Sequence, residues 1–421
     1  MITRLRALAL LTWVSTVAGC TGTPTTAWQG SVTDSAGIQL VRNPDTGIWG
    51  PDDDWTLTEV LRIGAAEGEP EYQFGQILAA GSIALASDGR IVVLDAQGQH
   101  LKVFTADGAY ERTIGRPGAG PGEIGIATQS SMLMAPGDTI LMVDLGNQRV
   151  NLYVMDGTFV RSFPIDLAVG FPFRWELTDD GRVVAQLRRL DFAGAAVPAD
   201  SMDVISVRRL DGTAGDTLMR VPSGKTVQFS GGLPEWNLFV PEPLWALWGE
   251  RVLYAVNDNY RIGVYRSGGQ LERVIEKPFT RAPVTEADQA PLKRALRKAI
   301  LDQGAPAQVA TQLVDTRLHF APHYPAFAQM LEGPNRTILV QLVRPLSDLS
   351  DEERESYDFT SGATGSPRWD VFDDQGRYLG ALLMPARFQP VEFRGNEIYG
   401  VQWDELDVQY VVKLVVGTTT G

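Results

Sequence analysis

Two histidines four residues apart are the first side chains in this sequence that could hold a metal. His319 and His323 occur in the run His319-Phe-Ala-Pro-His323, and this spacing would let both imidazoles chelate zinc from one face of a helix. Pro322 is incompatible with the interior of an ordinary helix, however, and no carboxylate lies within three residues of either histidine. We therefore predict no metal and no other cofactor.

The sequence also lacks the short motifs of several common catalytic sites. No G-x-S-x-G, H-E-x-x-H or P-loop pattern occurs. The paired carboxylates Asp179-Asp180 and Asp373-Asp374 fall at predicted turns, which favour aspartate for its short hydrogen-bonding side chain. No catalytic residue is predicted, and we interpret the chain as more consistent with a non-catalytic protein than with an enzyme.

The single cysteine carries the most specific chemical prediction. Cys20 ends the run Val17-Ala18-Gly19-Cys20, which resembles the lipobox of bacterial lipoproteins, where the cysteine thiol takes a diacylglycerol. Residues 1–19 fit a lipoprotein signal peptide, because two arginines precede a mostly apolar stretch. A buried core thiol is the alternative, but it does not explain why the one cysteine lies at this position.

The residue after Cys20 bears on localisation. Thr21 stands where an inner-membrane lipoprotein of a Gram-negative bacterium would carry aspartate. We therefore expect an exported protein, anchored by its N-terminal lipid in the outer membrane and facing the periplasm or the cell surface. No other stretch reaches the roughly 18 apolar residues of a transmembrane helix.

A repeated segment of twenty residues organises the rest of the chain. Three copies align without a gap: Asp95 to Ile114, Asp144 to Phe163 and Val256 to Ile275. A shorter copy runs from Arg368 to Leu382. Each has a turn glycine four residues after an aromatic residue, with alternating apolar positions around the turn, which is the pattern of a β-hairpin. Such repetition predicts a fold made by stacking one supersecondary unit.

Two successive hairpins give four antiparallel strands in about forty residues, which is one blade of a β-propeller. We predict an all-β fold, a six-bladed β-propeller over residues 55–416, in preference to a β-sandwich whose strands also alternate. The sixth blade shows only three strands after Gln389. Residues 55–63 are therefore expected to supply its outermost strand and close the ring.

These motifs resemble a known family. The run from Asp88 to Asp95, followed by the glycine-rich run from Gly115 to Ile124, resembles NHL-repeat propellers and, more narrowly, the six-bladed β-propeller lipoproteins of bacteria. The resemblance covers roughly residues 55–416 and is clearest in blades one, two and four. It implies the fold and export to the cell envelope, whereas members of that family largely have no assigned activity. The chain departs from the zinc-dependent amidating lyases among such propellers, because it has only three histidines.

Three further segments lie outside this pattern. Residues 20–54 are rich in Thr, Gly, Asp and Pro and predict a flexible tether after the lipidated cysteine, and residues 417–421 form a short tail. Residues 284–316 predict two helices inserted between blades four and five. This helical insertion would either cover a blade edge or form a lid over the channel mouth.

Composition limits the partners. The 421 residues are 44% hydrophobic and 21% charged, as in a folded globular chain. The formal net charge of −14 argues against nucleic acid as a partner, because phosphate binding needs a basic surface. The remaining candidate partners are the membrane, through the N-terminal lipid, and a carbohydrate, a peptide or an envelope protein.

Loops between the second and third strands of each blade share a face with the interblade loops, and such loops commonly carry binding. Arginine, aromatic and carboxylate groups converge there, which suits a sugar or peptide ligand. Arginines that hold one equivalent position in several copies, namely Arg149, Arg261 and Arg368, are interpreted as scaffold. The ligand-binding candidates are the residues that do not recur or that lie beside such loops: Arg188, Arg189, Trp403, Asp404, Trp369 and His323.

We predict a lipid-anchored envelope propeller that acts as a binding or protein-interaction module. The alternative is a metal-dependent propeller hydrolase or lactonase, or a polysaccharide lyase, with Ca²⁺ held in the channel by acidic and amide side chains. Asp95, Asp144 and Asn257 could form such a set, but their shared repeat position favours a role in turn geometry. A structural subunit of an envelope assembly is a third possibility.

Overall fold

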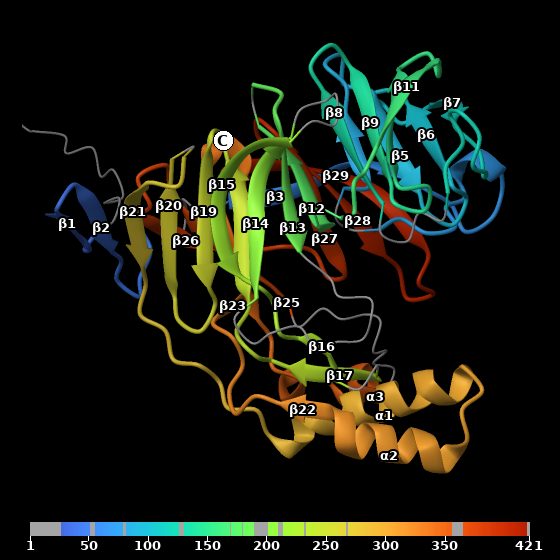
Figure 1. Cartoon of the computed structure of the whole chain (residues 1–421). Helices are drawn as coiled ribbons and strands as arrows, with labels where there is room; N and C mark the ends of the chain where they lie inside the picture. The colour runs from blue at the N-terminus through green and yellow to red at the C-terminus, as the bar shows by residue number, and fades with distance from the viewer. Residues whose placement is uncertain are drawn as a thin grey trace, which may run out of the picture.

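Short runs of alternating apolar and polar residues produce six antiparallel sheets around one axis, with a small side domain on one face (Figure 1). The chain is an all-β, six-bladed propeller with few helices. This computed structural model describes residues 27–50, 55–78, 81–125, 130–168, 170–178, 180–188, 201–208, 214–230, 233–266, 268–355 and 365–418. Within these ranges no helix has the length and apolarity that crossing a bilayer requires.

The first three blades each contain four strands in chain order, the first lying nearest the axis. Blade one contains β4 (Ile83–Leu85), β5 (Ile91–Asp95), β6 (His100–Phe104) and β7 (Tyr110–Ile114). Blade two contains β8 (Ser131–Ala135), β9 (Thr139–Asp144), β10 (Arg149–Val154) and β11 (Phe159–Pro164). Blade three contains β12 (Phe171–Leu177), β13 (Val183–Arg188), β14 (Met202–Arg208) and β15 (Ala214–Pro222).

The remaining blades follow the same order. Blade four contains β18 (Pro243–Trp248), β19 (Arg251–Val256), β20 (Arg261–Tyr265) and β21 (Leu271–Glu276). Blade five contains β23 (Phe327–Glu332), β24 (Ile338–Val343), β25 (Gly365–Phe372) and β26 (Tyr378–Leu383). Blade six contains β27 (Phe388–Arg394), β28 (Glu397–Trp403) and β29 (Gln409–Thr418).

The ring closes as the sequence predicts. β3 (Trp55–Ile63) pairs antiparallel with β29 as the fourth and outermost strand of blade six. The closure removes an open sheet edge and joins the two ends of the propeller. The recurring turn glycines have positive φ angles that L-residues rarely adopt, as at Gly108 (88°) and Gly157 (94°), which explains why glycine recurs there. Six apolar clusters fill the six interfaces between neighbouring blades, and together they form the core.

The segment before the propeller differs from prediction. β1 (Ser31–Ser35) and β2 (Ile38–Arg42) form a hairpin, and β2 pairs in parallel with β21, so the sheet of blade four has six strands. The Asn43 amide donates to the carbonyls of Glu276 and Gly376 (3.2 and 3.0 Å) and accepts from the amide of Tyr378 (2.7 Å). A flexible tether is therefore the wrong description of residues 27–50, because these contacts bind them to blades four and five.

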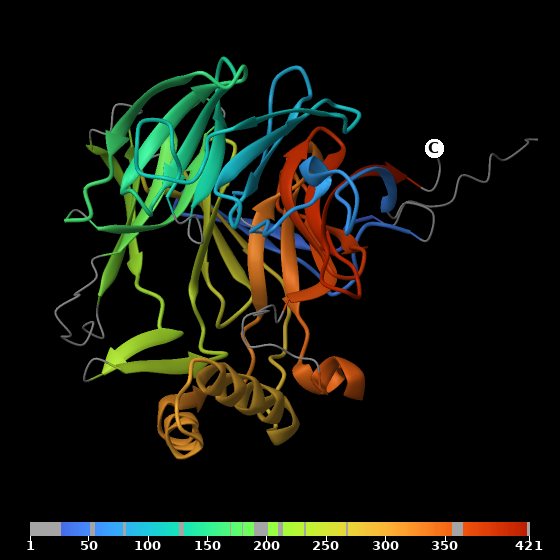
Figure 2. The same ribbon diagram turned by 90° about the vertical axis from the view of Figure 1, so that its right-hand side faces the viewer.

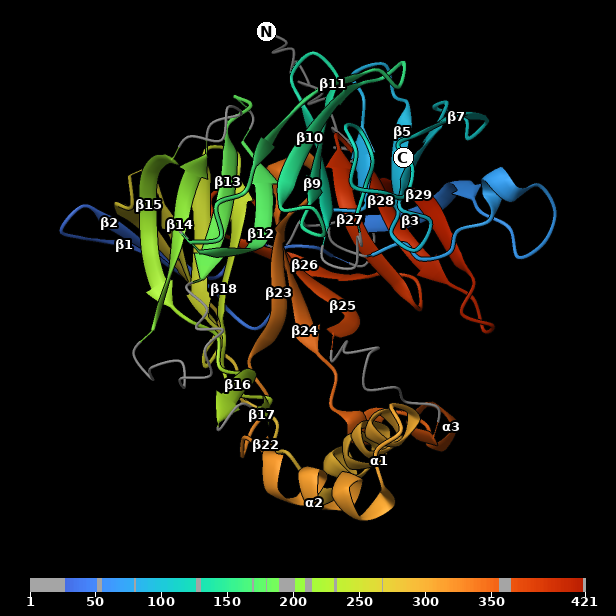
Figure 3. The same cartoon turned by 45° about the vertical axis from the view of Figure 1, so that its right-hand side comes forward.

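A side domain is formed by three connections. They are the segment between blades three and four, the segment between blades four and five, and the segment between β24 and β25 within blade five. It contains β16 (Val227–Ser230), β17 (Leu233–Leu238), α1 (Glu286–Asp302), α2 (Ala307–Arg317), β22 (Leu318–Phe320), the short helix η3 (Leu346–Asp348) and α3 (Asp351–Glu355). β17 pairs in parallel with β22, and two small apolar clusters give the side domain its own core. Figures 2 and 3 show it beneath one face of the propeller.

The predicted helices of residues 284–316 are present as α1 and α2, but they cover no outer blade edge. The edge of blade four is covered by β2 instead. The carboxylate of Asp288 in α1 accepts from the amide of Ser347 in η3 (2.6 Å), which ties the helical pair to the insertion within blade five. Three insertions distant in sequence are thereby joined into one body.

We expect the two N-terminal segments to differ in their effect on stability. A chain that begins at Trp55 loses the Asn43 contacts and uncovers β21, so it should melt about 5 °C or more below a chain that begins at Ala27. A chain that begins at Gly64 also loses β3 and should aggregate through the edge of β29. Calorimetry and light scattering measure both effects. Equal melting temperatures for the chains that begin at Ala27 and Trp55 would show that the hairpin does not stabilise the propeller.

Candidate functional site

One face of the propeller carries the interblade loops and the loops between second and third strands, and we call it the mouth face. Recurring acidic and amide side chains there hold the loop that enters each blade. Asp95 accepts from the amides of Gly75 and Gln76 (2.9 and 3.1 Å), and Asp144 accepts from the amide of Gly125 (3.0 Å). Both carboxylates are buried, so their role is to satisfy buried backbone donors.

The other blades use different side chains for the same purpose. In blade four, Asn257 accepts from the amide of Glu242 (2.7 Å) and donates to the carbonyl of Phe327 (2.7 Å). In blade six, Gln409 accepts from the amide of Ile77 and donates to its carbonyl (2.5 and 3.0 Å). The prediction that the repeated polar positions serve loop geometry is consistent with these contacts. In the described part of the chain, no three His, Cys, Asp or Glu side chains lie close enough to share a metal ion.

Arg188 lies at the mouth end of β13, but its charge is already paired. Its Nε and Nη2 atoms donate to the two carboxylate oxygens of buried Asp203 (2.8 and 2.7 Å). The ring of Phe173 lies over the guanidinium, 4.4 Å from ring centroid to Cζ, and is 49% exposed. Arg188 therefore presents an aromatic face at the mouth instead of a free cation. Arg189 falls outside the described residues.

Trp403 and Asp404 lie on blade six, across the ring from Arg188, so the structure does not bring the predicted group together. Trp403 is partly buried and packs against the cluster between blades six and one. The carboxylate of Asp404 accepts from the amides of Leu406 and Val408 (2.9 and 3.0 Å) and from the Tyr410 hydroxyl (3.0 Å). These contacts give Asp404 a turn-forming role.

Trp369 and His323 are not placed as ligand contacts. Trp369 is completely buried in the cluster between blades five and six, so its prediction as a ligand-binding residue is wrong. His323 is exposed, and its backbone carbonyl accepts from Arg281 (3.0 Å). The spacing of His319 and His323 does not produce a helix, because β22 and an irregular segment contain them.

A polar cleft on blade four, on the side that faces blade three, is the best-formed candidate site. It is open to solvent and has a volume of about 190 Å³. The residues that line it are Tyr254, Ala255, Val256, Asp258, Asn259, Arg261, Gly263, Tyr265, Leu271 and Val274. The Tyr254 and Tyr265 rings meet edge to face with centroids 6.2 Å apart. Pockets that enclose a small ligand typically measure roughly 300–1,000 Å³, so this smaller, open cleft suits one ring of a ligand and not a whole enclosed molecule.

The polar groups of this cleft are available to a ligand. Neither tyrosine hydroxyl forms a hydrogen bond to any described residue, and the same holds for the side chains of Asp258 and Asn259, which are exposed. Burial, with the neighbouring Tyr265, raises the pKa of Tyr254 to about 12, so its hydroxyl remains a neutral donor at ordinary pH. Arg261 pairs with Glu276 at the edge of the cleft.

The cleft exists because the loop that enters blade four follows a different path. Tyr265 occupies the recurring aromatic position, whose equivalents Phe104 and Tyr153 are fully buried. In the loop entering blade one, Tyr72 packs against Phe104 (5.8 Å between ring centroids). In the loop entering blade two, the backbone carbonyl of Gly122 accepts a hydrogen bond from the Tyr153 hydroxyl (3.1 Å). The loop entering blade four instead forms β16 and β17 of the side domain, and Tyr265 is only partly buried.

Glu242 holds together the two ends of the segment that leaves the propeller between blades three and four. Its carboxylate oxygen accepts from the amides of Lys225 and Thr226 (2.7 and 2.5 Å) and from the Thr226 hydroxyl (2.6 Å). The chain leaves blade three at Ser223, whose hydroxyl donates to Asp203 (2.5 Å). The side domain is thus attached beside the cleft by charge-assisted hydrogen bonds.

Charged side chains also line the central channel. Arg174 and Glu176 of β12 form an ion pair, and Glu176 accepts from the amide of Leu247 in the neighbouring blade four (2.7 Å). Glu392 of β27 faces this pair. Burial raises the pKa of Glu392 to about 7, against the opposing effect of Arg394 and with added repulsion from Glu176 and Glu332. A carboxyl group with such a pKa could exchange protons near neutral pH.

Comparisons with known proteins agree on the fold. Residues 78–176 match the model of a protein family described as a 6-bladed beta-propeller. A Bacteroides fragilis protein, described only as a candidate for export, is similar in structure over 90% of this chain and 99% of its own, with 12% identity and a TM-score of 0.50. The shared feature is the fold.

Propellers with enzymatic names resemble the chain more distantly. A gluconolactonase of Xanthomonas campestris matches over 81% of this chain and 88% of its own (10% identity, TM-score 0.41). A virginiamycin B lyase of Staphylococcus aureus matches over 86% and 99% (9% identity, TM-score 0.40). Neither comparison bears on what this chain binds. Comparison with curated protein sequences gives no match.

The raised pKa of Glu392 predicts a pH-dependent stability. Native Glu392 holds its proton up to about pH 7, whereas the unfolded chain releases it near the ordinary value of 4.5, so its contribution is lost as pH rises through this window. Glu392→Gln mimics the protonated form and should stabilise the protein at pH 8 by about 1–3 kcal/mol, with no gain near pH 4.5. Urea unfolding at both pH values measures this, with exposed Glu405→Gln as the control. A gain of equal size at both pH values would contradict the assignment.

Proposed function

We propose that this chain is an envelope binding module and that the polar cleft between blades three and four is its ligand site, with a saccharide as the ligand. The observation that carries the proposal is Tyr265, which is only partly buried and lines the cleft, whereas the equivalent residues in blades one and two are fully buried. A scaffold role would be served as well by the closed arrangement. The open arrangement leaves aromatic and hydrogen-bonding groups together along the side of blade four, from the mouth face to the far end of β20.

The chemistry of the cleft favours a saccharide. A sugar ring offers C–H groups to an aromatic face and hydroxyls that both donate and accept. Tyr254 and Tyr265 supply the rings and two free hydroxyls, while Asp258 and Asn259 supply acceptors and an amide donor. The acidic net charge of −14 disfavours polyanionic ligands. A neutral or amino-sugar chain fits these groups, and a short peptide is the competing ligand class.

The proposal includes a lipid anchor at Cys20. The lipobox-like run before Cys20 and the lack of any other cysteine support it. The anchored chain would then present the propeller to the periplasm or the cell surface. Intact-mass spectrometry of membrane-extracted protein should show a diacylglycerol on Cys20, and a Cys20→Ser chain should lack it. Recovery of the chain with residues 1–19 still attached would refute this part of the proposal.

The central channel supports a second candidate function. The pKa of Glu392 near 7 is what a general acid or base requires, so a hydrolase, lactonase or polysaccharide lyase remains a candidate. In that case Glu392→Gln should abolish turnover of lactone or polysaccharide substrates, while Tyr265→Ala should leave it unchanged. Binding without turnover that depends on Tyr265 supports the binding module instead.

Residues 27–421 should bind members of a panel of short neutral and amino-sugar oligosaccharides, detected as a rise in melting temperature and by calorimetry. Tyr265→Ala should weaken binding about tenfold or more, because it removes the ring, and Tyr265→Phe should weaken it less. Asp258→Ala should also weaken it. Asp107→Ala, an equally exposed turn substitution on blade one, serves as the control.

Two outcomes would contradict the proposed site. One is saccharide binding that Tyr265→Ala and Asp258→Ala leave unchanged. The other is binding of short peptides alone, which would assign the cleft to a different ligand class.

A further inference from the structure

A glycine in the middle of a strand lies beside Tyr265 in the cleft on blade four. Gly263 is the third residue of β20, and alternation along the strand places it on the same face as Tyr265. Its φ angle lies outside the left-handed range, so the backbone does not require glycine there. Glycine inside a strand costs stability and often marks a place where another group approaches closely. The space around residue 263, and not its backbone conformation, therefore explains this glycine.

The other aligned copies of the repeat carry a buried polar side chain at this position. The equivalent residues are Lys102 in blade one, Asn151 in blade two and Asp370 in blade five. Lys102 donates to the carbonyl of Gln73 in the loop that enters blade one (2.6 Å). Asn151 donates to the carbonyl of Glu123 in the loop that enters blade two (3.2 Å). In blade four this loop leaves for the side domain, and the position carries no side chain.

The ring of Tyr265 occupies the space that a side chain on residue 263 would need. A Cβ atom on Gly263 would lie 2.7 Å from Cε2 and 3.2 Å from Cζ of Tyr265, so the ring would have to move. Because these atoms belong to the hydroxyl-bearing end of the ring, the tyrosine folds back along β20 toward Arg261. Burial raises the pKa of Tyr265, and the positive charge of Arg261 opposes this rise, which agrees with that direction.

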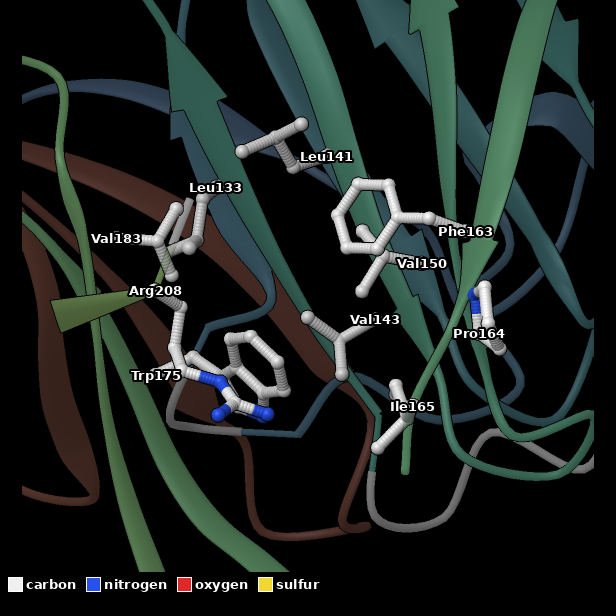
Figure 4. Close-up of a pocket in the computed structure, with 10 residues that line it drawn as sticks. All are labelled: Leu133, Leu141, Val143, Val150, Phe163, Pro164, Ile165, Trp175, Val183 and Arg208. Carbon is white, nitrogen blue, oxygen red and sulfur yellow. The ribbon is translucent and has the colours of Figure 1, made fainter. Parts of the chain in front are cut away.

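The interface between blades two and three shows that aromatic residues alone do not leave a cleft. Phe163, Trp175 and several aliphatic side chains meet there (Figure 4), and only about 20 Å³ of space remains within this packed apolar cluster. The cleft on blade four keeps about 190 Å³ and is open to solvent. The open space therefore depends on where the ring of Tyr265 is held, and Gly263 permits that placement.

We propose that Gly263 is the positioning residue of the cleft and that it directs the Tyr265 hydroxyl toward a single bound sugar ring. This inference rests on the proposed saccharide site. With no side chain at residue 263, the Tyr265 hydroxyl points along β20 toward the part of the cleft lined by Asp258 and Asn259. A sugar ring between these groups can both donate and accept hydrogen bonds. A side chain at residue 263 would displace the tyrosine and separate these groups.

The first test needs no ligand and compares melting temperatures of residues 27–421. Gly263→Ala should lower the melting temperature by about 2 °C or more, because its methyl group meets the Tyr265 ring. In a Tyr265→Ala background the same substitution should not lower it, because the ring is absent and alanine restricts the unfolded chain. This difference between the two backgrounds is the expected sign that residues 263 and 265 act as one unit.

The second test measures binding of cellotriose and of the trimer of glucosamine by calorimetry. Gly263→Ala should weaken the binding of whichever trisaccharide binds by about fivefold or more. In the Tyr265→Ala background it should cause no further loss, because Gly263 acts only through the tyrosine. A purely structural role for Gly263 would change the melting temperature without changing the affinity.

The control is Gly380→Ala on β26 of blade five, away from the cleft. A Cβ atom there would lie 2.5 Å from Cε3 of Trp49, so this substitution also places a methyl group against an aromatic ring. It should lower the melting temperature and leave the affinity for both trisaccharides unchanged. A matched loss of affinity in this variant would show that reduced stability, and not the position of Tyr265, weakens binding.

Two results would overturn the inference. One is a drop in melting temperature of equal size with and without the Tyr265 ring, and the other is unchanged affinity in Gly263→Ala. If neither trisaccharide binds the unmodified chain, the saccharide proposal fails. The comparison of melting temperatures in the two backgrounds then still decides whether Gly263 positions Tyr265.

Discussion

Buried side-chain acceptors that hold the interblade loops at the mouth face are the interaction on which the rest of the structure depends. Asp95 and Asp144 each accept from backbone amides of the loop that enters their blade, and Asn257 does so in blade four. Removing one such acceptor would leave buried amides unsatisfied, which costs roughly 1–3 kcal/mol. These contacts fix where each blade begins, and so they determine which interblade spaces are filled.

A cleft forms where the loop that enters a blade does not pack over the recurring aromatic residue. In blades one and two the entering loop turns back over the recurring aromatic residue and fills the interface. In blade four Glu242 holds the two ends of the loop, and the part between them builds the side domain, so Tyr265 remains partly exposed. Blade three, whose repeat is degenerate, leaves the buried indole nitrogen of Trp175 without a partner among the described residues. The cleft at Tyr265 faces this blade, where the sequence departs most from its repeat.

The sequence predicted the parts that follow from local patterns. The recurring glycine turns and alternating strands identify the blades, and the need to close a sheet edge identifies β3. The local sequence pattern does not reveal the pairing of β2. This strand pairs in parallel with β21, which lies more than 200 residues away in the sequence. Trp369 was predicted as a ligand-binding candidate, yet both faces of the second half of β25 are enclosed between blades. The cleft at Tyr265 depends on the path of a distant loop, so the tyrosine could be recognised only as another core aromatic.

Hydrogen–deuterium exchange of residues 27–421, with and without a saturating neutral or amino-sugar oligosaccharide that raises the melting temperature, tests the central claim most directly. Residues 254–265 contain most of the cleft lining, and Glu242, which holds Lys225 and Thr226, contacts this segment through Asn257. The account predicts that added protection is concentrated in these segments. Protection confined to the channel strands β12 and β27, with no change at 254–265, would contradict it and favour the channel as the functional site.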